Sequence, residues 1–401
     1  MFNSLKFKVI LFGFIFTFFS SFGQSYFLGL FNSSIREALS ITHGQFGSIF
    51  ASATLCSSLL LIWVGKKIDD VNIFKFAFFV TILLSFACFF FSRITSVFLL
   101  FIGIFLMRFS GQGMMSHTAS TTISRYFTRT RGRALSISWF GLSSAEFVMP
   151  VLMVYLLTII DWQNLWIIFS ITVLIILPIV SFLLIKNLNL DSREVNDENK
   201  KEVEIKQWKR REVIKDYRFY IISSNMLAMP WIFTGFAVFQ SFVQTSKGWG
   251  PYVIAQSFMS YSIFSVLTLF LSGFLIDRYS SRKLLIYMNI PLLLSVIVLF
   301  SFDTPVTAFV FLGLVGISNG FANILGSSTW AELYGVKYLG SIKALTTALM
   351  VFATAFGTAL FGYLIDTGFT VGDIAVVSGT YIFISLILLF FVRKKLNPVI
   401  I

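Results

Sequence analysis

Two oppositely charged side chains lie deep inside apolar stretches of this 401-residue chain. Arg108 lies within residues 97–119 and Glu146 within residues 134–158, and each stretch is long enough to span a bilayer. A charge at the centre of a membrane costs roughly 2.5–3.5 kcal/mol on insertion scales, so such residues usually have a partner or a function. Because a guanidinium binds carboxylates and a carboxylate can take up a proton, the two residues suggest anion binding and proton transfer.

The depth of the two charges follows from helical geometry. At about 1.5 Å per residue, Arg108 lies about 16 Å from the start of its stretch and Glu146 about 18 Å from the start of its own. A hydrocarbon core is about 30 Å thick, so both should lie near its middle, on consecutive antiparallel helices. We therefore expect an ion pair, although a buried pair often stabilises no better than apolar residues. The pair is either purely structural or faces a solute path, with Arg108 as anion anchor and Glu146 as proton-coupling residue.

Other polar side chains recur on one face of neighbouring apolar stretches. Asn319 and Asn323 stand four residues apart, one helical turn, within residues 306–329. Two amides on a lipid-facing stripe would be costly, so this face should line a cavity or pack on a neighbouring helix. For any one polar residue packing is the simpler role, but together they suggest a polar path with aromatic walls. The residues expected to bind a solute are Arg108, Gln24, Tyr26, Trp139, Trp231, Tyr261, Asn319 and Asn323.

Twelve apolar stretches must position these side chains. Hydrophobic residues make up 57% of the chain and charged residues only 12%, against about 25% charged in a soluble domain. The apolar runs are long and continuous, unlike the short alternations of a barrel. The predicted fold is therefore an all-α membrane protein with twelve transmembrane helices. The expected spans are 9–31, 46–64, 73–92, 97–119, 134–158, 163–186, 219–242, 252–274, 284–301, 306–329, 342–365 and 373–392.

The basic residues predict how the chain is oriented. Of its 31 lysines and arginines, only Arg36, Arg93 and Lys247 fall on one predicted side, and Arg108 lies within a span. Positive loops mark the cytoplasmic side, so both termini should be cytoplasmic, in a multi-pass protein of a bacterial inner membrane. Basic residues spread over short loops do not form a nucleic-acid surface, despite the net charge of +13. The expected partners are a small-molecule substrate, a proton and membrane lipid, and the expected state is a monomer.

One polar segment divides the chain into two halves of six spans. Residues 200–216 are dense in charges of both signs, which is typical of a solvated linker or a cytosolic amphipathic helix; a lipid-headgroup or regulatory contact is the other interpretation. The halves echo each other, since GKKIDD begins at Gly65 and GFLIDRYSSRK at Gly273, 208 residues later. Such repeats are typical of secondary transporters. We expect an N-terminal six-helix bundle at 1–190, a cytosolic linker at 191–216 and a second, pseudo-symmetric bundle at 217–401.

The chain lacks motifs of an intramembrane metalloenzyme or an ATP-driven pump. It contains no HExxH and no GxxxxGK[ST] sequence. Its two cysteines, Cys56 and Cys88, lie within predicted spans and have no metal-binding spacing. We therefore expect no enzyme, no catalytic residues, no metal and no cofactor.

Two loops and one helix resemble the major facilitator superfamily. The loop GFLIDRYSSRK (273–283) matches the signature loop of that family, and GKKID (65–69) resembles its shorter first-half copy. The stretch RFSGQG (108–113) matches the arginine–glycine pattern of the fourth helix. The resemblance covers the whole chain. It implies that contacts of these loops hold the transporter open to one side of the membrane and break when it opens to the other. The glycines would allow helices to approach closely. The residues to which it gives a gating role are Gly65, Asp69, Gly273, Asp277, Arg278 and Arg282.

Within that family, residues 22–50 and the stretches above are most similar to bacterial relatives of the monocarboxylate and oxalate–formate carriers. In addition to a cation such as Arg108, those carriers usually place a second one in the eighth helix, and some place one in the middle of the eleventh. Here the eighth predicted span, residues 252–274, contains no cation, and Lys343 lies at the predicted cytoplasmic end of the eleventh span. One cationic site suits one carboxylate, so the resemblance implies alternating-access transport of a monocarboxylate-type anion with proton symport.

Two further interpretations stay open for the function. A zwitterionic or neutral solute, or an exchange reaction, would use Glu146 to neutralise Arg108 or to bind a cationic head beside aromatic rings. A non-transporting sensor would require a larger cytosolic domain than residues 187–217.

Overall fold

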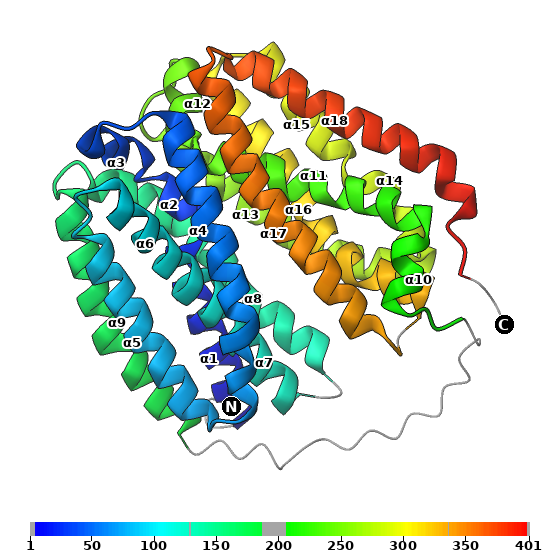
Figure 1. The fold of residues 1–401 in the computed structure, drawn as a ribbon, viewed down its shortest axis with the longest axis horizontal. Helices are drawn as coiled ribbons and strands as arrows, with labels where there is room; N and C mark the ends of the chain where they lie inside the picture. Colours follow the sequence, from blue (N-terminus) through cyan, green and yellow to red (C-terminus); the bar gives the residue numbers. More distant parts are fainter. Residues whose placement is uncertain (1–4, 128–129, 187–205, 336, 399–401) are drawn as a thin grey trace. The chain divides into compact units, whose positions relative to one another are not determined.

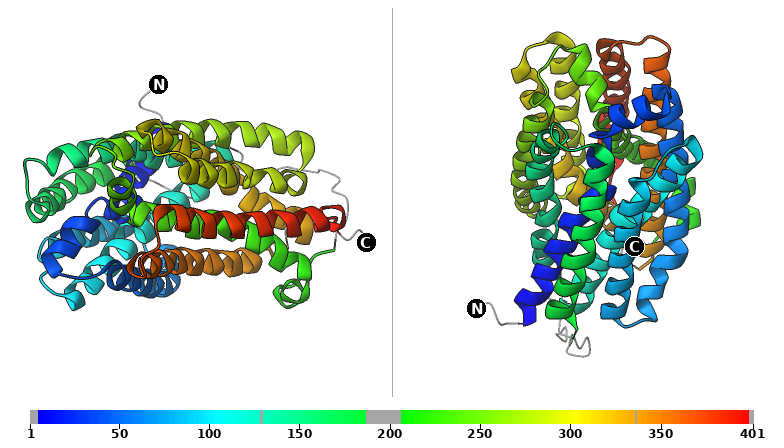
Figure 2. Two further views of the ribbon diagram at one scale, coloured as in Figure 1. Left: turned by 90° about the horizontal axis from the view of Figure 1, so that it is seen from above. Right: turned by 90° about the vertical axis from the view of Figure 1, so that its left-hand side faces the viewer.

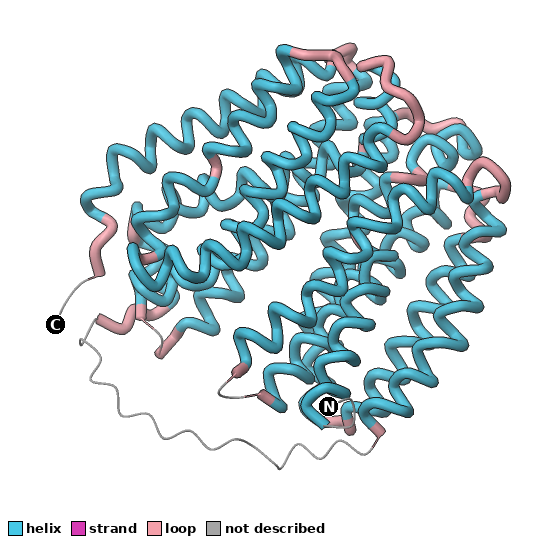
Figure 3. The backbone as a smooth tube through the Cα atoms, turned by 180° about the vertical axis from the view of Figure 1, so that it is seen from behind, coloured by secondary structure: helices cyan, strands magenta, loops and turns pink. Residues whose placement is uncertain are grey.

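The structure, a computed structural model, consists of helices joined by loops and turns in the residues that it describes, and contains no strand among them (Figure 3). Twelve helical segments among them are long and apolar enough to cross a membrane, as the sequence predicts. The chain is therefore an integral, multi-pass membrane protein. The described residues are 5–127, 130–186, 206–335 and 337–398, with the backbone alone for Asp69, Arg131, Asp277 and Ser327.

The chain forms two compact units, Met1–Glu198 and Asn199–Ile401. The described part of the first unit contains six of the membrane-crossing segments and runs from blue to green in Figure 1. Its elements are α1 (Leu5–Ser20), η1 (Ser21–Gly23), α2 (Ser25–Gly29), α3 (Asn32–Leu39), α4 (His43–Val64), η2 (Gly65–Asp69), α5 (Ile73–Phe91), α6 (Val97–Met107), η3 (Arg108–Met115), α7 (Ser116–Tyr126), α8 (Arg131–Leu156) and α9 (Trp162–Ile185).

The described part of the second unit contains the other six segments and runs from green to red in Figure 1. A short helix, α10, precedes them. Its elements are α10 (Arg210–Lys215), α11 (Tyr217–Val238), α12 (Gln240–Ser246), α13 (Val253–Tyr279), α14 (Ser281–Met288), α15 (Ile290–Ser301), α16 (Pro305–Tyr334), α17 (Leu339–Asp366), α18 (Val371–Val392) and η4 (Arg393–Lys395).

Helices pair in the same order within each unit. In the first unit the first and fifth spans pack together (α1 with α8), as do the third and sixth (α5 with α9) and the second and fourth (α4 with α6 and η3). In the second unit the corresponding pairs are α11 with α17, α15 with α18 and α13 with α16. The pairs can be followed within each unit in Figures 1 and 2. This repeated pairing supports the two six-helix halves that the internal sequence echo predicts.

Two spans of the first unit depart from α-helical geometry where they contact each other. The first span breaks between α1 and α2, where Ser21–Gly23 forms one 3₁₀ turn and Gln24 is extended at φ −79° and ψ 151°. The fourth span contains a π-helical segment, η3, which packs against the broken turn. The continuous helix expected over 9–31 is therefore wrong at this turn, although the span itself exists. Helix breaks and π segments inside membrane spans frequently occur at functional sites.

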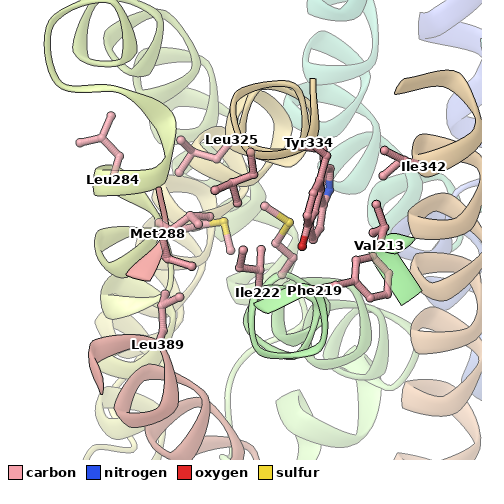
Figure 4. Close-up of a cluster of buried hydrophobic side chains, with 14 residues drawn as sticks. Val213, Phe219, Ile222, Leu284, Met288, Leu325, Tyr334, Ile342 and Leu389 are labelled. Atoms are coloured by element: carbon pink, nitrogen blue, oxygen red, sulfur yellow. The ribbon is translucent and has the colours of Figure 1, made fainter. Parts of the chain in front are cut away.

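The last part of the predicted linker is packed against the second unit. Helix α10 places Val213 in the buried cluster shown in Figure 4, which also contains Tyr334. Trp208 donates its backbone N–H to the Tyr334 carbonyl, and the two rings meet edge-on with centroids 5.4 Å apart. Of the two interpretations of this segment, residues 210–215 fit the amphipathic helix rather than an unstructured linker, because Val213 is buried whereas Arg210, Arg211 and Lys215 are exposed. Residues 187–205 lie outside the described part of the chain.

Helix α10 begins at a side-chain cap. The backbone N–H of Lys209 donates to the Glu212 carboxylate at 2.7 Å, and Lys206 Nζ lies 2.9 Å from the same carboxylate. These two interactions, the backbone hydrogen bond first, hold the pKa of Glu212 below its ordinary value. The cap supplies a partner for a backbone N–H at the start of the helix and so explains why α10 begins at Arg210.

Candidate functional site

Arg108 is held at the broken turn of the first span. Its side chain is 3% exposed, and its Nη1 donates to the Gly23 carbonyl oxygen and to Ser25 Oγ, both at 3.1 Å. The guanidinium also lies over the Phe50 ring, 5.3 Å from the ring centroid. A backbone carbonyl freed by a helix break costs several kcal/mol in lipid unless it accepts a hydrogen bond. Arg108 therefore stabilises the break, and the break fixes the orientation of Arg108.

The other edge of the same guanidinium makes no hydrogen bond to any described residue. Nε of Arg108 is fully buried without a partner, and its side-chain hydrogen bonds all come from Nη1. Nε and Nη2 together form the fork that binds a carboxylate with two parallel hydrogen bonds. Three of the five N–H donors of this side chain thus have no hydrogen-bond partner among the described residues, and they lie in a plane that the bonds to the helix break hold in place.

Glu146 is the second buried charge of the first unit. It lies on α8, is 7% exposed, and forms no ion pair with Arg108 among the described side chains. The ion pair expected from the sequence is therefore wrong, because Arg108 donates instead to the break in the first span. The Glu146 carboxylate is close enough to Tyr26 on α2 for an electrostatic interaction. Within the described part of this unit, each charge is buried without an opposite charge to neutralise it.

Two glycines let the fourth span touch the broken turn. A Cβ at Gly23 would collide with the Met107 carbonyl oxygen and the Gln112 nitrogen. A Cβ at Gly111 would lie only 2.7 Å from the Gly23 nitrogen. The absence of both side chains brings the two backbones into contact, and this contact places Arg108 within reach of the Gly23 carbonyl.

The second unit contains a cavity of about 210 Å³. Ser223 from α11 and Asn319 and Asn323 from α16 form part of its wall. Asn319 Nδ2 donates to Ser265 Oγ at 2.9 Å, which fixes its amide, whereas Ser223 Oγ is buried with no hydrogen-bond partner among the described residues. The lining residues include no ionisable side chain. Four methionines contribute to the apolar wall: Met226, Met229, Met288 and Met350.

The other aromatic and polar residues predicted to bind a solute lie in several environments. Trp139 on α8 is exposed, and Gln24 is the half-buried extended residue of the helix break. Trp231 is buried edge-on against rings of α17 and α18. Tyr261 stacks on Phe233 with ring centroids 4.8 Å apart. Trp231 and Tyr261 do not line the 210 Å³ cavity, so any contact they make with a solute stays a prediction.

The signature loop of the first half is held by α7. A hydrogen bond of 3.0 Å joins His117 Nε2 to the Gly65 carbonyl, and Arg125 Nη1 donates to the Ile68 carbonyl at 3.0 Å. A Cβ at Gly65 would lie 3.4 Å from the His117 ring, an ordinary contact distance, so the gating role of this glycine stays a prediction. The side chain of Asp69 lies outside the described part of the structure, and its gating role stays a prediction.

The signature loop of the second half is tied to the C-terminal segment through Arg282. Its Nη1 donates to the Leu396 carbonyl at 3.0 Å and to Asn397 Oδ1 at 2.8 Å. Its Nε lies 3.9 Å from the carboxylate of Glu332 at the end of α16. These contacts all lie within the second unit and link the start of α14 to the end of α16 and to the segment after α18.

The remaining predicted gating residues of this loop make fewer contacts. Arg278 is exposed, and its guanidinium lies 5.3 Å from the centroid of the Tyr279 ring, which belongs to the next residue in the chain. A Cβ at Gly273 would have no described atom within 4 Å, so this glycine makes no close helix contact within its own unit, and its gating role stays a prediction. The side chain of Asp277 lies outside the described residues, and its role stays a prediction.

Ser25, Phe50 and Ser223 are among the residues of the two sites that were not predicted from the sequence. Ser25 follows Gly23 and Gln24, and a glycine beside small polar residues within an apolar run was the available signal for a helix break. Phe50 and Ser223 gave no signal, because the chain contains 50 phenylalanines and a single serine in a membrane helix usually bonds to its own backbone.

A short pattern typical of serine hydrolases occurs within α16. Residues 316–320 read GISNG, but they lie in the interior of a continuous helix, and Ser318 is fully buried. A nucleophile elbow requires a sharp turn between a strand and a helix that exposes the serine. The pattern therefore forms no hydrolase site.

Comparisons with known proteins agree with this architecture. The family model described as Major Facilitator Superfamily matches residues 13–259 and 221–400. A bacterial homologue of the human lysosomal transporter Spinster, in an inward-facing and unoccupied conformation, superposes with a TM-score of 0.72 at 13% identity, covering 98% of each chain. The nucleoside transporter NupG superposes with a TM-score of 0.69 at 15% identity, covering 98% of this chain and 99% of the other. At these identities the superpositions show the fold alone. A sequence search finds no match among curated proteins.

Proposed function

The chain belongs to the Major Facilitator Superfamily and is a membrane transporter rather than an enzyme; from this premise we propose that it carries a small monocarboxylate-type anion together with a proton. The observation that carries the proposal is the unpaired Nε–Nη2 edge of Arg108, buried in the same unit as the unpaired carboxylate of Glu146. Alternating access is the proposed mechanism, and the inner membrane with cytoplasmic termini is the proposed location.

The charges of the first unit favour an anion at Arg108. A buried charge without a partner is costly, and the cost falls when a counter-ion binds to it. A carboxylate that accepts two hydrogen bonds from Nε and Nη2 would neutralise the guanidinium and leave its bonds to Gly23 and Ser25 intact. Arg108 would then bind the solute with one edge and hold the helix break with the other.

The same argument favours a proton at Glu146. With no cation beside it among the described residues, a buried carboxylate loses its desolvation cost when it becomes protonated. One anion at Arg108 and one proton at Glu146 together leave the unit without uncompensated buried charge. The carrier that holds both the anion and the proton would therefore be favoured over a carrier that holds only one of them, which suits proton–anion symport.

The test is transport by the purified protein in lipid vesicles with an alkaline interior. Labelled lactate and pyruvate should accumulate above their external concentration, and a protonophore should abolish the accumulation. Protein-free vesicles with the same gradient give the passive diffusion of the undissociated acid, which is subtracted. Uptake that equals this control, or that ignores the proton gradient, would contradict the proposal.

A zwitterionic or neutral solute is the second candidate. The observation that favours it is the 210 Å³ cavity of the second unit, whose lining includes no ionisable residue. In that case uptake of betaines or uncharged solutes would be independent of the proton gradient, and lactate would not compete with them.

A further inference from the structure

We infer that the 210 Å³ cavity of the second unit binds an uncharged aromatic ring bearing a carboxamide or a similar donor–acceptor group. The inference rests on the chain being a transporter but not on the anion and proton sites proposed for the first unit. Three features of the cavity carry it, namely its volume, its lack of charge and the unpaired polar atoms in its wall.

The volume sets the size of the ligand. An engineered apolar protein cavity of about 150 Å³ holds one benzene molecule. A cavity of about 210 Å³ therefore accommodates a benzene ring with one further small group attached. It is too small for a ring system with a sugar or a long chain held entirely inside it.

The lining excludes ions as the preferred ligands. Binding a carboxylate or an ammonium group away from water without an opposite charge is costly, and none of the lining side chains carries a charge. Apolar and polarisable groups occupy most of the wall instead. Met226, Met229 and Met350 contribute thioethers to the wall, and thioethers form favourable contacts with the flat ring of a ligand.

The polar atoms of the wall specify the group on the ring. Ser223 also lines the cavity, and its Oγ is buried with no partner among the described residues, so a ligand would gain this hydroxyl as a partner on rotation of the Ser223 side chain toward the cavity. Asn319 is oriented by its bond to Ser265 Oγ, and its Oδ1 makes no hydrogen bond to a described residue. Asn323 lies one helical turn further on the same face. Two amides and a hydroxyl together offer both donors and acceptors, and a carboxamide has both to match them.

Benzamide and benzoate are the two probes for the experiment, because they have the same shape and differ in charge. Binding to the purified full-length protein is measured by calorimetry and by the shift in thermal unfolding. We expect benzamide to bind and Asn323→Leu to weaken its affinity about tenfold, which corresponds to the net loss of roughly one hydrogen bond. Asn164→Ala is the matched control, since Asn164 is an exposed amide of α9 in the other unit.

A second variant fills the cavity. Gly326 lines the cavity, and a Cβ there would meet no atom within 4 Å, so Gly326→Leu introduces bulk into open space without backbone strain. Benzamide binding should be lost in this variant while the unfolding temperature stays near that of the wild type. Failure of benzamide to bind the wild type, or equal affinity in Gly326→Leu, would overturn the inference.

The two probes also separate this inference from the proposed function. Benzoate binding that requires Arg108 tests the anion site of the first unit, whereas benzamide binding that requires Asn323 tests the cavity of the second. Either can fail while the other succeeds, so the outcome identifies which site was assigned wrongly.

Discussion

The two six-helix halves share one order of helix pairing but differ in where they bury charge. The first half buries Arg108 and Glu146 beside a broken helix and a π segment. The second half lines its cavity with amides, a hydroxyl and methionines, and its hydrogen-bonded ion pair at Asp216 and Arg218 lies at the start of α11. The same scaffold thus supports two different chemistries.

The difference indicates what a helix break contributes to a membrane site. A continuous helix satisfies its own backbone, so it offers only side chains to a ligand. A broken helix frees a carbonyl, and here that carbonyl is the acceptor that orients Arg108. The first half is therefore organised around backbone and charge, whereas the cavity of the second half depends on side chains of α11, α16 and α17.

Arg108→Gln should have the largest effect, and it tests most directly whether transport depends on the buried charge of the first half. We expect proton-driven lactate uptake to fall to the protein-free level, because glutamine lacks the charge and the fork. Arg93→Gln removes an exposed arginine and is the control. Ser25→Ala removes one clamp of the guanidinium but keeps its charge, so it should retain most uptake. Normal uptake by Arg108→Gln would remove this residue from the site.

Glu146→Gln should separate solute movement from proton movement. The variant mimics the protonated carboxylate, so we expect it to exchange labelled for unlabelled lactate across the vesicle membrane but to lose accumulation driven by the proton gradient. Counterflow and gradient-driven uptake, measured on the same preparation, check this. Glu37→Gln changes an exposed glutamate of α3 and should behave as the wild type. Accumulation retained by Glu146→Gln would exclude its proton role.

Glycine substitutions should sharpen the structural contrast between the halves. Gly23→Ala places a methyl group against the backbone of the fourth span, so we expect a loss of about 1–3 kcal/mol in stability, as for an overpacked core. Gly326→Ala meets open space and should raise the stability by about 0.5–1 kcal/mol through helix propensity. Thermal unfolding of both variants in detergent checks the opposite signs. Equal shifts in unfolding temperature for the two variants would mean that the first and fourth spans are less closely packed at Gly23 than described.

Arg282→Gln should have the smallest effect on stability. The side chain is partly exposed and its contact with Glu332 is long, so its loss should cost less than about 1 kcal/mol. Its two hydrogen bonds to the C-terminal segment are lost as well, so this segment should be cleaved faster in limited proteolysis.

If the loop has the proposed gating role, the maximal rate of uptake by Arg282→Gln should fall while the solutes that compete stay the same. Lys283→Gln, at the exposed neighbouring position, is the control, and altered competition by Arg282→Gln would argue against gating.

Much of the fold could be predicted from the sequence because membrane insertion is governed by local composition. Apolar runs of about 20 residues must become helices in lipid, whatever their neighbours are, and the twelve spans follow from this rule alone. The six-plus-six division followed from the internal echo and from one polar segment. The linker was less predictable, since its charges concealed Trp208 and Val213, whose burial depends on the second unit.

The sequence by itself determined that Arg108 and Glu146 must be buried at mid-depth, and that Asn319 and Asn323 must share a face, because span position and helical spacing fix both. Only the tertiary structure decided that Arg108 bonds to the broken turn rather than to Glu146, and that the amides line a cavity. The partner of a side chain depends on which backbones cross, and here the crossing of Gly23 and Gly111 brings together residues far apart in the chain.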